Sequence, residues 1–215
     1  MDLLLYMQRH QGEILALTLQ HIWLASLAVG ISTVIGVVCG ILVSRVRILA
    51  APVIGVAGIF YTIPSLALFG FLIPVTGIGP RPALIALVVY AQLVLIRNTF
   101  VGILGVDPAA LEAGRGMGMR GWQLLTLVEL PLALPVVMAG IRTTAVMSIG
   151  IAAIASYIGA GGLGTLIFQG ISRVDGVLIL AGAIPVSLLA IAVDTTLAGV
   201  ERALSPWARD RAGGA

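Results

Sequence analysis

Long apolar stretches, separated by short polar segments, dominate this chain. About five of them are long enough to cross a bilayer, because a helix of about 20 residues spans its hydrocarbon core. They cover residues 17–43, 48–75, 82–104, 132–157 and 177–199. The pattern predicts an all-α polytopic membrane protein with about five transmembrane helices, organised as a single transmembrane domain over residues 1–215.

The longest polar interruption covers residues 107–131, between the third and fourth apolar stretches. Asp107 and the proline after it favour a helix start, since the carboxylate can accept from first-turn N–H groups and the fixed φ of proline suits the first helical position. We expect this helix to run to about Met117. The residues that allow a sharp turn or a close approach are Gly114, Gly116 and Gly118. A second short helix over 122–128, ended by Pro131, completes a helix-turn-helix outside the membrane. An ordinary connecting loop is the alternative.

Several residues of this segment have a characteristic spacing. Glu112, Ala113 and Gly114 are followed by Gly118, and later by Leu130-Pro131. This spacing resembles the EAA loop of binding-protein-dependent ABC importer permeases, with Gly114 where the second alanine usually stands. Four further segments resemble the osmoprotectant branch of that family, the permeases for glycine betaine, carnitine and choline: TIPSLALFG at 62–70, IRNTFVGI at 96–103, AGIRT at 139–143 and IGAGGLG at 158–164. The resemblance covers about residues 17–204.

The resemblance implies the fold of a type I ABC importer permease. Residues 105–131 become a cytoplasmic coupling loop on which separate ABC ATPase subunits dock, with the coupling residues Asp107, Glu112, Ala113, Gly114, Gly118, Leu130 and Pro131. The other implied partners are an extracytoplasmic solute-binding protein and a second permease copy or a sister permease. The expected solute is a quaternary ammonium compound such as glycine betaine, choline or carnitine. ATP and Mg²⁺ belong to the ATPase, so we expect no cofactor in this chain.

Composition supports a place in the lipid bilayer and argues against several other functions. Hydrophobic residues make up 60% of the chain and charged residues 10%, with a mean hydropathy of +1.14, whereas about a quarter of the residues in soluble domains are charged. The sequence has no lysine, and its scattered arginines form no nucleic-acid patch. Two histidines and one cysteine assemble no catalytic or metal site, and the GxGxxG at 159–164 follows no predicted strand. We therefore expect a permease subunit that is not an enzyme and holds no metal.

The arginines also predict the orientation in the membrane, because cytoplasmic ends of spans carry an excess of basic residues. If the coupling loop faces the cytoplasm, that side holds Arg45, Arg47, Arg115, Arg120, Arg202, Arg209 and Arg211. The other side then holds Arg9, Arg81 and Arg173. We expect a multi-pass protein of the bacterial inner membrane, with its N-terminus outside and its C-terminus in the cytoplasm.

A candidate translocation path begins at Pro64 in the second span. This proline must bend the helix and free a carbonyl, a feature tolerated beside a neighbouring helix or a water-filled path. Tyr61, Thr62 and Ser65 lie close to it in sequence and are the other candidates. A purely structural kink is the alternative.

Arg142 is the second candidate for the path. It follows Pro131 by about 16 Å of helix, where an unpaired charge costs about 2.5–3.5 kcal/mol even on insertion scales. We expect it to face the protein interior and to form an ion pair with Asp194 of the fifth span. Arg97 competes for this carboxylate, and an unpaired Arg142 that extends to the membrane surface is the alternative.

Two other functions remain open on the sequence alone. A permease of the same architecture for methionine or another small nutrient is disfavoured only by the TIPSLALFG and IRNTF segments. A secondary transporter without an ATPase is more remote, because such proteins usually show inverted repeats or paired intramembrane acids.

Overall fold

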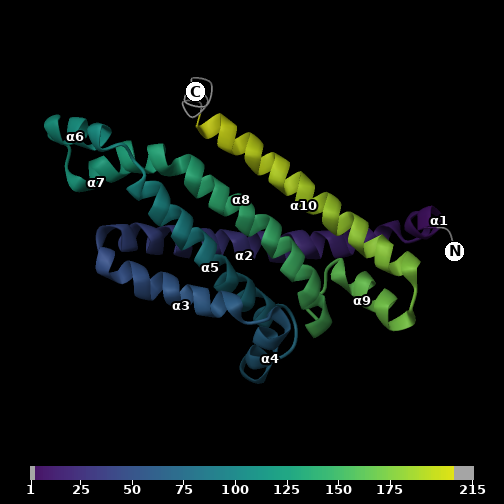
Figure 1. Ribbon diagram of the computed structural model, residues 1–215. Coiled ribbons are helices and arrows are strands. Elements are labelled where there is room, and N and C mark those ends of the chain that lie inside the picture. The colour runs from purple at the N-terminus through teal and green to yellow at the C-terminus, as the bar shows by residue number, and fades with distance from the viewer. Residues whose placement is uncertain (1–2, 206–215) are drawn as a thin grey trace.

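The computed structural model describes residues 3–205, which form helices and short connections and contain no strand. Its four long helices are α2 (Gln11–Arg45), α5 (Pro80–Leu104), α8 (Leu130–Ala155) and α10 (Gly176–Leu204) (Figure 1). Each belongs to a segment long and apolar enough to cross a membrane. At 35 residues, α2 is about 50 Å long and extends beyond a hydrocarbon core of about 30 Å. The expected all-α membrane architecture is confirmed.

The centre of the bundle is a close contact between α2 and α5, and α8 packs against both. A Cβ atom on Gly36 would lie 2.5 Å from the Cβ of Leu95, and one on Gly40 would lie 2.5 Å from the Cβ of Thr99. Neither position has room for a side chain. The two glycines, four residues apart, therefore let the α2 and α5 backbones approach closely, as small residues do in membrane helix pairs.

The second apolar stretch forms two helices instead of one bent helix. They are α3 (Ala50–Thr62) and α4 (Ser65–Thr76), and the chain bends by 96° between them. Ile63 has a ψ angle of 127°, because proline disfavours the helical conformation in the residue before it. Pro64 itself is also extended, with a ψ angle of 137°. The hydroxyl of Tyr90, on α5, donates to the Ile63 carbonyl and satisfies an acceptor at the break. Within residues 3–205, four helices are long and apolar enough to be spans, and there are five candidate spans if this pair is taken as one.

The polar segment forms α6 (Pro108–Gly116) and α7 (Gly121–Leu124), joined by a turn. From α7 the chain continues through a π-helix (Leu125–Glu129) directly into α8. The expected end of the second loop helix at Pro131 is therefore wrong. Pro131 lies in the first turn of α8, and the wider π-helical turn before it accommodates the proline ring and its missing N–H.

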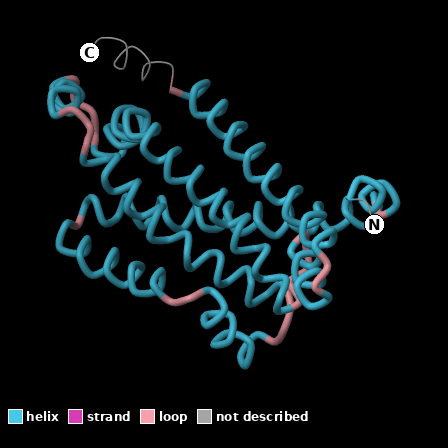
Figure 2. Tube along the Cα trace, turned by 45° about the vertical axis from the view of Figure 1, so that its right-hand side comes forward, coloured by secondary structure: helices cyan, strands magenta, loops and turns pink. Residues whose placement is uncertain are grey.

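The bundle has two distinct ends. α6, α7 and the end of α10 at Leu204 lie at one end, and α1 (Leu3–Arg9) and α9 (Gly164–Arg173) lie at the other (Figures 1 and 2). Short 3-10 helices connect α2 to α3 (Arg47–Leu49) and follow α8 (Ser156–Ile158). The coupling loop and the N-terminal helix are thus separated by the full length of the bundle.

Candidate functional site

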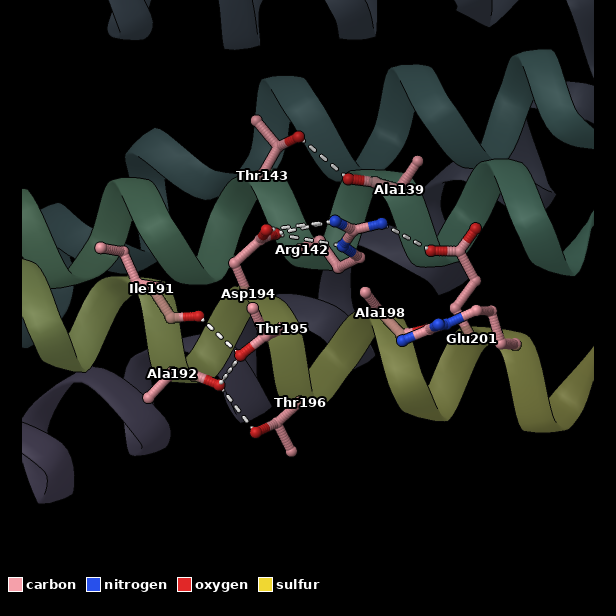
Figure 3. Close-up of polar contacts among 11 residues, drawn as sticks. Ala139, Arg142, Thr143, Ile191, Ala192, Asp194, Thr195, Thr196, Ala198 and Glu201 are labelled. Atoms are coloured by element: carbon pink, nitrogen blue, oxygen red, sulfur yellow. Dashed lines mark hydrogen bonds and ion pairs between the residues drawn. The ribbon is translucent and has the colours of Figure 1, made fainter.

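A polar cluster joins α8 to α10 (Figure 3). Its side chains are 29% exposed for Arg142, 41% for Asp194 and 24% for Glu201, so Arg142 is not enclosed in the interior of the chain as expected. The Arg142 guanidinium donates to Asp194 from Nε at 3.1 Å and from Nη2 at 3.0 and 3.2 Å. Its Nη1 donates to Oε2 of Glu201 at 2.9 Å. Arg97 is exposed, and the hydrogen bonds of Asp194 go to Arg142. One guanidinium thus pairs with two carboxylates, so acidic groups outnumber basic ones among these three side chains.

Glu201 was not among the residues predicted for this cluster. A signal was present, because Glu201 follows Asp194 by seven positions and residues seven apart lie on the same face of a helix. The spacing placed both carboxylates on one side of α10. Only the packing of α10 against α8 showed that this side faces Arg142.

An open cavity of about 570 Å³ adjoins the cluster. Its lining includes Tyr61, Arg142, Thr143, Met147 and Asp194. Tyr61 is 42% exposed, and its ring meets that of Tyr90 edge-on at a centroid distance of 6.3 Å. The volume is within the range of about 300–1,000 Å³ that small-molecule sites occupy. Of the residues predicted for the path, Tyr61 and Arg142 are therefore brought together.

The remaining path candidates do not line this cavity. Thr62 donates its hydroxyl to the Ile59 carbonyl of its own helix at 2.7 Å. Pro64 and Ser65 lie at the break, where Pro64 directly precedes α4 and Ser65 is its first residue. Their positions set the direction of α4.

At the other functional region, a specific backbone turn ends α6. Gly118 follows the last turn of α6 and has a φ of +77°. Its N–H donates to the Arg115 carbonyl at 2.9 Å, and the Met119 N–H donates to the Gly114 carbonyl at 3.1 Å. These two bonds form a Schellman motif, in which the residue with positive φ is usually glycine. Gly118 is thus required by the turn itself.

The two loop helices are held together by a close approach at Gly114. This residue is buried, and a Cβ atom on it would lie 2.6 Å from Cδ1 of Leu124 on α7. At the start of α6, the Asp107 carboxylate accepts from the Ala109 N–H at 2.9 Å and caps the helix. The shape of the loop is therefore held by contacts within the loop itself.

The other residues predicted to couple the loop to an ATPase differ in their exposure. Glu112 and Ala113 are exposed on α6, whereas Leu130 and Pro131 are half-buried at the start of α8. The structure places the first pair at the surface and the second pair against the bundle. Only Glu112 and Ala113 of these four are open to contact with another protein.

A second arginine–carboxylate pair lies beside the loop and was not predicted. Arg45 donates from Nη1 to Oε1 of Glu129 at 3.0 Å and from Nη2 to Oε2. The Glu129 side chain is 4% exposed and that of Arg45 is 44% exposed. The signal was an acid directly before the apolar Leu130 stretch, but nothing in the sequence connected it to Arg45. In residues 3–205 no group of three or more His, Cys, Asp or Glu side chains is arranged to hold a metal ion.

Comparison with known proteins decides the family. Residues 15–210 match the family described as the binding-protein-dependent transport system inner membrane component. The chain belongs to this family. It is 47% identical to the osmoprotectant import permease protein OsmW of Salmonella typhimurium, over 96% of this chain and 98% of that protein. It is 43% identical to the glycine betaine/carnitine/choline transport system permease protein OpuCB of Bacillus subtilis, over 95% of this chain and 94% of that protein. The choline transport system permease protein OpuBB of Bacillus subtilis is 44% identical, over 96% and 95%.

Solved structures share the fold. An inward-facing form of the MetNI methionine ABC transporter has a chain with a TM-score of 0.80 and 24% identity, over 89% of this chain and 95% of that chain. A chain of an amino acid ABC transporter crystallised with histidines has a TM-score of 0.75 and 20% identity, over 94% and 98%. The expected type I ABC importer permease fold is confirmed.

Proposed function

We propose that this chain is the transmembrane permease subunit of an ABC importer that moves a quaternary ammonium osmoprotectant, such as glycine betaine, choline or carnitine, into the cell. The observation that carries this proposal is the similarity to permeases named for these solutes, which extends over nearly the whole of each chain. It includes the spans as well as the coupling loop. A loop motif alone would indicate only the wider family.

The exposed helix-turn-helix supports a mechanism driven by partner proteins. Two permeases, either two copies of this chain or this chain and a sister permease, present α6 to two cytoplasmic ABC ATPases. These partners bind ATP and Mg²⁺. When they close on ATP, the loops move with them and the spans change their packing, which opens the path to alternate sides. An extracytoplasmic solute-binding protein delivers the solute, and this chain performs no bond chemistry.

The positions of the arginines support a cytoplasmic coupling loop. Arg115 lies in α6 and Arg120 directly precedes α7, while Arg45 ends α2, Arg47 begins the 3-10 helix after it and Arg202 lies in the last turn of α10. The end of α10 lies at the same end of the bundle as α6 and α7 (Figure 1). Arg209 and Arg211 are outside the described residues. The opposite end holds Arg9, Arg81 and Arg173, so the bias favours a cytoplasmic C-terminus and an N-terminus outside. We expect a reporter enzyme that works only in the cytoplasm to be active when it is fused to the C-terminus, and one that works only outside to be inactive. The reverse result would contradict both the orientation and the docking of an ATPase.

The cavity beside Arg142 supports a passage for a cationic group. Tyr61 offers an aromatic face, which attracts ammonium groups through cation–π interaction. The excess carboxylate of the Arg142 cluster adds to this attraction. An open, shallow site of this kind binds its solute weakly, as a passage must, and leaves selection of the solute to the binding protein.

The proposal is tested by uptake into proteoliposomes that contain the permease and its ATPase, with the binding protein on the opposite side of the membrane. Labelled glycine betaine, choline, carnitine and methionine are offered separately. We expect ATP-dependent uptake of at least one quaternary ammonium compound and none of methionine. Uptake of methionine alone would contradict the substrate class. Uptake that needs no ATP would contradict the ABC mechanism and favour a secondary transporter.

A methionine permease is the second candidate, and only the fold supports it. The similarity to the methionine transporter chain is 24% in sequence, a level at which permeases for different solutes share one architecture. The osmoprotectant proposal therefore stands above it.

A further inference from the structure

The Arg45–Glu129 pair lies where the coupling loop meets the first long helix. Arg45 is the last residue of α2, and Glu129 is the last residue of the π-helix before α8. The two residues are 84 positions apart. Their side chains join a transmembrane helix directly to the segment that carries the loop.

The pair belongs to a continuous series of contacts that begins at the loop. α6 rests on α7 through the close approach of Gly114 to Leu124. From Leu124 the chain runs without interruption through the π-helix to Glu129. A displacement of α6 and α7 therefore reaches Glu129 along packed helix, and Glu129 holds Arg45.

On the other side of the pair, α2 is fixed to α5. Gly36 and Gly40 leave no space between these helices, since a Cβ atom at either would meet Leu95 or Thr99 at 2.5 Å. Packed helices of this kind move as one body, because close contacts are not continuously deformable. A movement of the Arg45 end of α2 must therefore shift or tilt α5 as well.

The geometry of the pair indicates a positioning role more than a stabilising one. The pair adds little net stability, because burying the Glu129 carboxylate is costly and solvent weakens its attraction to the half-exposed Arg45. Both oxygens of Glu129 are engaged by the guanidinium, and such a two-point contact fixes orientation as well as distance. The π-helix that presents Glu129 is itself a rare element that occurs often at functional sites.

We propose that the Arg45–Glu129 pair transmits the movement of the coupling loop to α2, and through α2 to α5. Besides this pair, the loop is joined to the spans by its continuity with α5 and α8 and by the apolar cluster around Ile103 and Val137, against which Leu111 of α6 and Ile41 of α2 both pack. The ion pair is the polar, directional connection among these contacts. The inference rests on the proposed function, because it presumes that a partner ATPase moves the loop.

The test compares Glu129→Gln and Arg45→Gln with Arg47→Gln as the matched control. Arg47 is exposed, lies two residues beyond Arg45 and forms no ion pair within residues 3–205. Each variant is reconstituted with the ATPase and the binding protein. Three quantities are measured: co-purification of the ATPase, the thermal midpoint of the complex, and the amount of solute taken up per ATP hydrolysed.

We expect the first two variants to assemble with the ATPase and to lose about 2- to 30-fold in uptake per ATP, the range found for residues that couple distant sites. Arg47→Gln should keep the wild-type ratio. Arg45→Lys retains the charge but not the two-point contact, so it should lose part of the ratio. This conservative variant also decides the question if either glutamine variant fails to fold.

An unchanged uptake per ATP in Glu129→Gln and Arg45→Gln would overturn the inference. If either of these variants fails to fold, an unchanged uptake per ATP in Arg45→Lys would overturn it. A loss of ATPase co-purification in parallel with uptake would also overturn it, because the pair would then only shape the docking surface. The wild-type complex separates this inference from the function beneath it. If wild type shows no ATP-dependent uptake, the proposed function fails, and if wild type is active and the variants match it, only the role of the pair fails.

Discussion

The predicted coupling loop and the Arg142 cluster are two polar regions of an otherwise apolar protein, and they are built differently. In the loop, the shape comes from neighbouring residues: Asp107 caps α6 and Gly118 ends it through its positive φ. In the cluster, Arg142 of α8 contacts two residues of α10: Asp194, which is 52 positions away in the sequence, and Glu201, which is 59 positions away. The loop therefore depends on single backbone positions. The cluster depends on the balance of charges among its members, so its variants should not behave independently.

The largest effect should come from Gly118→Trp. A side chain at a φ of +77° is strained by about 1–2 kcal/mol, and a bulky ring at the surface of the loop would also obstruct a docked partner. We expect loss of solute-stimulated ATP hydrolysis and of uptake, while insertion into the membrane is retained. Gly118→Ala adds the strain without the bulk, and Gly116→Ala is the matched control, because Gly116 is helical with open space around it. Normal solute-stimulated ATP hydrolysis and normal uptake in Gly118→Trp would show that the loop only connects two spans and has no coupling role.

The Arg142 cluster should show the next largest effect, and the effect should be non-additive. Arg142→Ala leaves both Asp194 and Glu201 without their cation, whereas Asp194→Ala leaves Arg142 its bond to Glu201. We expect Arg142→Ala to reduce uptake and thermal stability more than Asp194→Ala does. The double variant should be no worse than Arg142→Ala alone. Losses that add strictly would show that the two residues do not interact.

A moderate effect is expected at the cavity. Tyr61→Ala should lower the maximal rate of uptake and leave the half-saturating solute concentration nearly unchanged, because the binding protein selects the solute. Tyr61→Phe keeps the aromatic face and should retain most of the rate. The opposite result would be that the permease binds glycine betaine tightly without the binding protein, and that Tyr61→Ala abolishes this binding. That result would place selectivity in this chain.

The smallest effect should come from Glu112→Ala. Glu112 is exposed on α6, and an exposed or rim charge changes binding by less than about fivefold. We expect a small loss of solute-stimulated ATP hydrolysis with normal assembly. A loss as large as that of Gly118→Trp would show instead that Glu112 becomes buried against the ATPase and pairs there.

Much of the fold could be predicted because long apolar runs have few alternatives in a membrane. The predicted spans over 82–104 and 132–157 coincide with α5 and α8 to within a few residues. Prolines were harder to interpret. Pro64 was expected to bend a helix and instead separates α3 from α4, and Pro131 was expected to end a helix and instead lies inside a continuous one. The two prolines have opposite outcomes because their surroundings differ. A π-helix precedes Pro131 and accommodates its missing N–H, so the helix continues. At Pro64 the helix is broken, and the Tyr90 hydroxyl from α5 donates to the free carbonyl of Ile63.

The sequence by itself determined the helical membrane architecture, the loop with its cap and turn glycine, and the family to which the chain belongs. These depend on segment length, on local backbone preferences and on spacing, all of which are properties of neighbouring residues. Only the tertiary structure decided that Glu201 joins Arg142 and Asp194, that Arg45 holds Glu129, and that Tyr61 shares a cavity with Arg142. Each of these contacts joins different helices, and which faces of two helices meet depends on packing across the whole bundle.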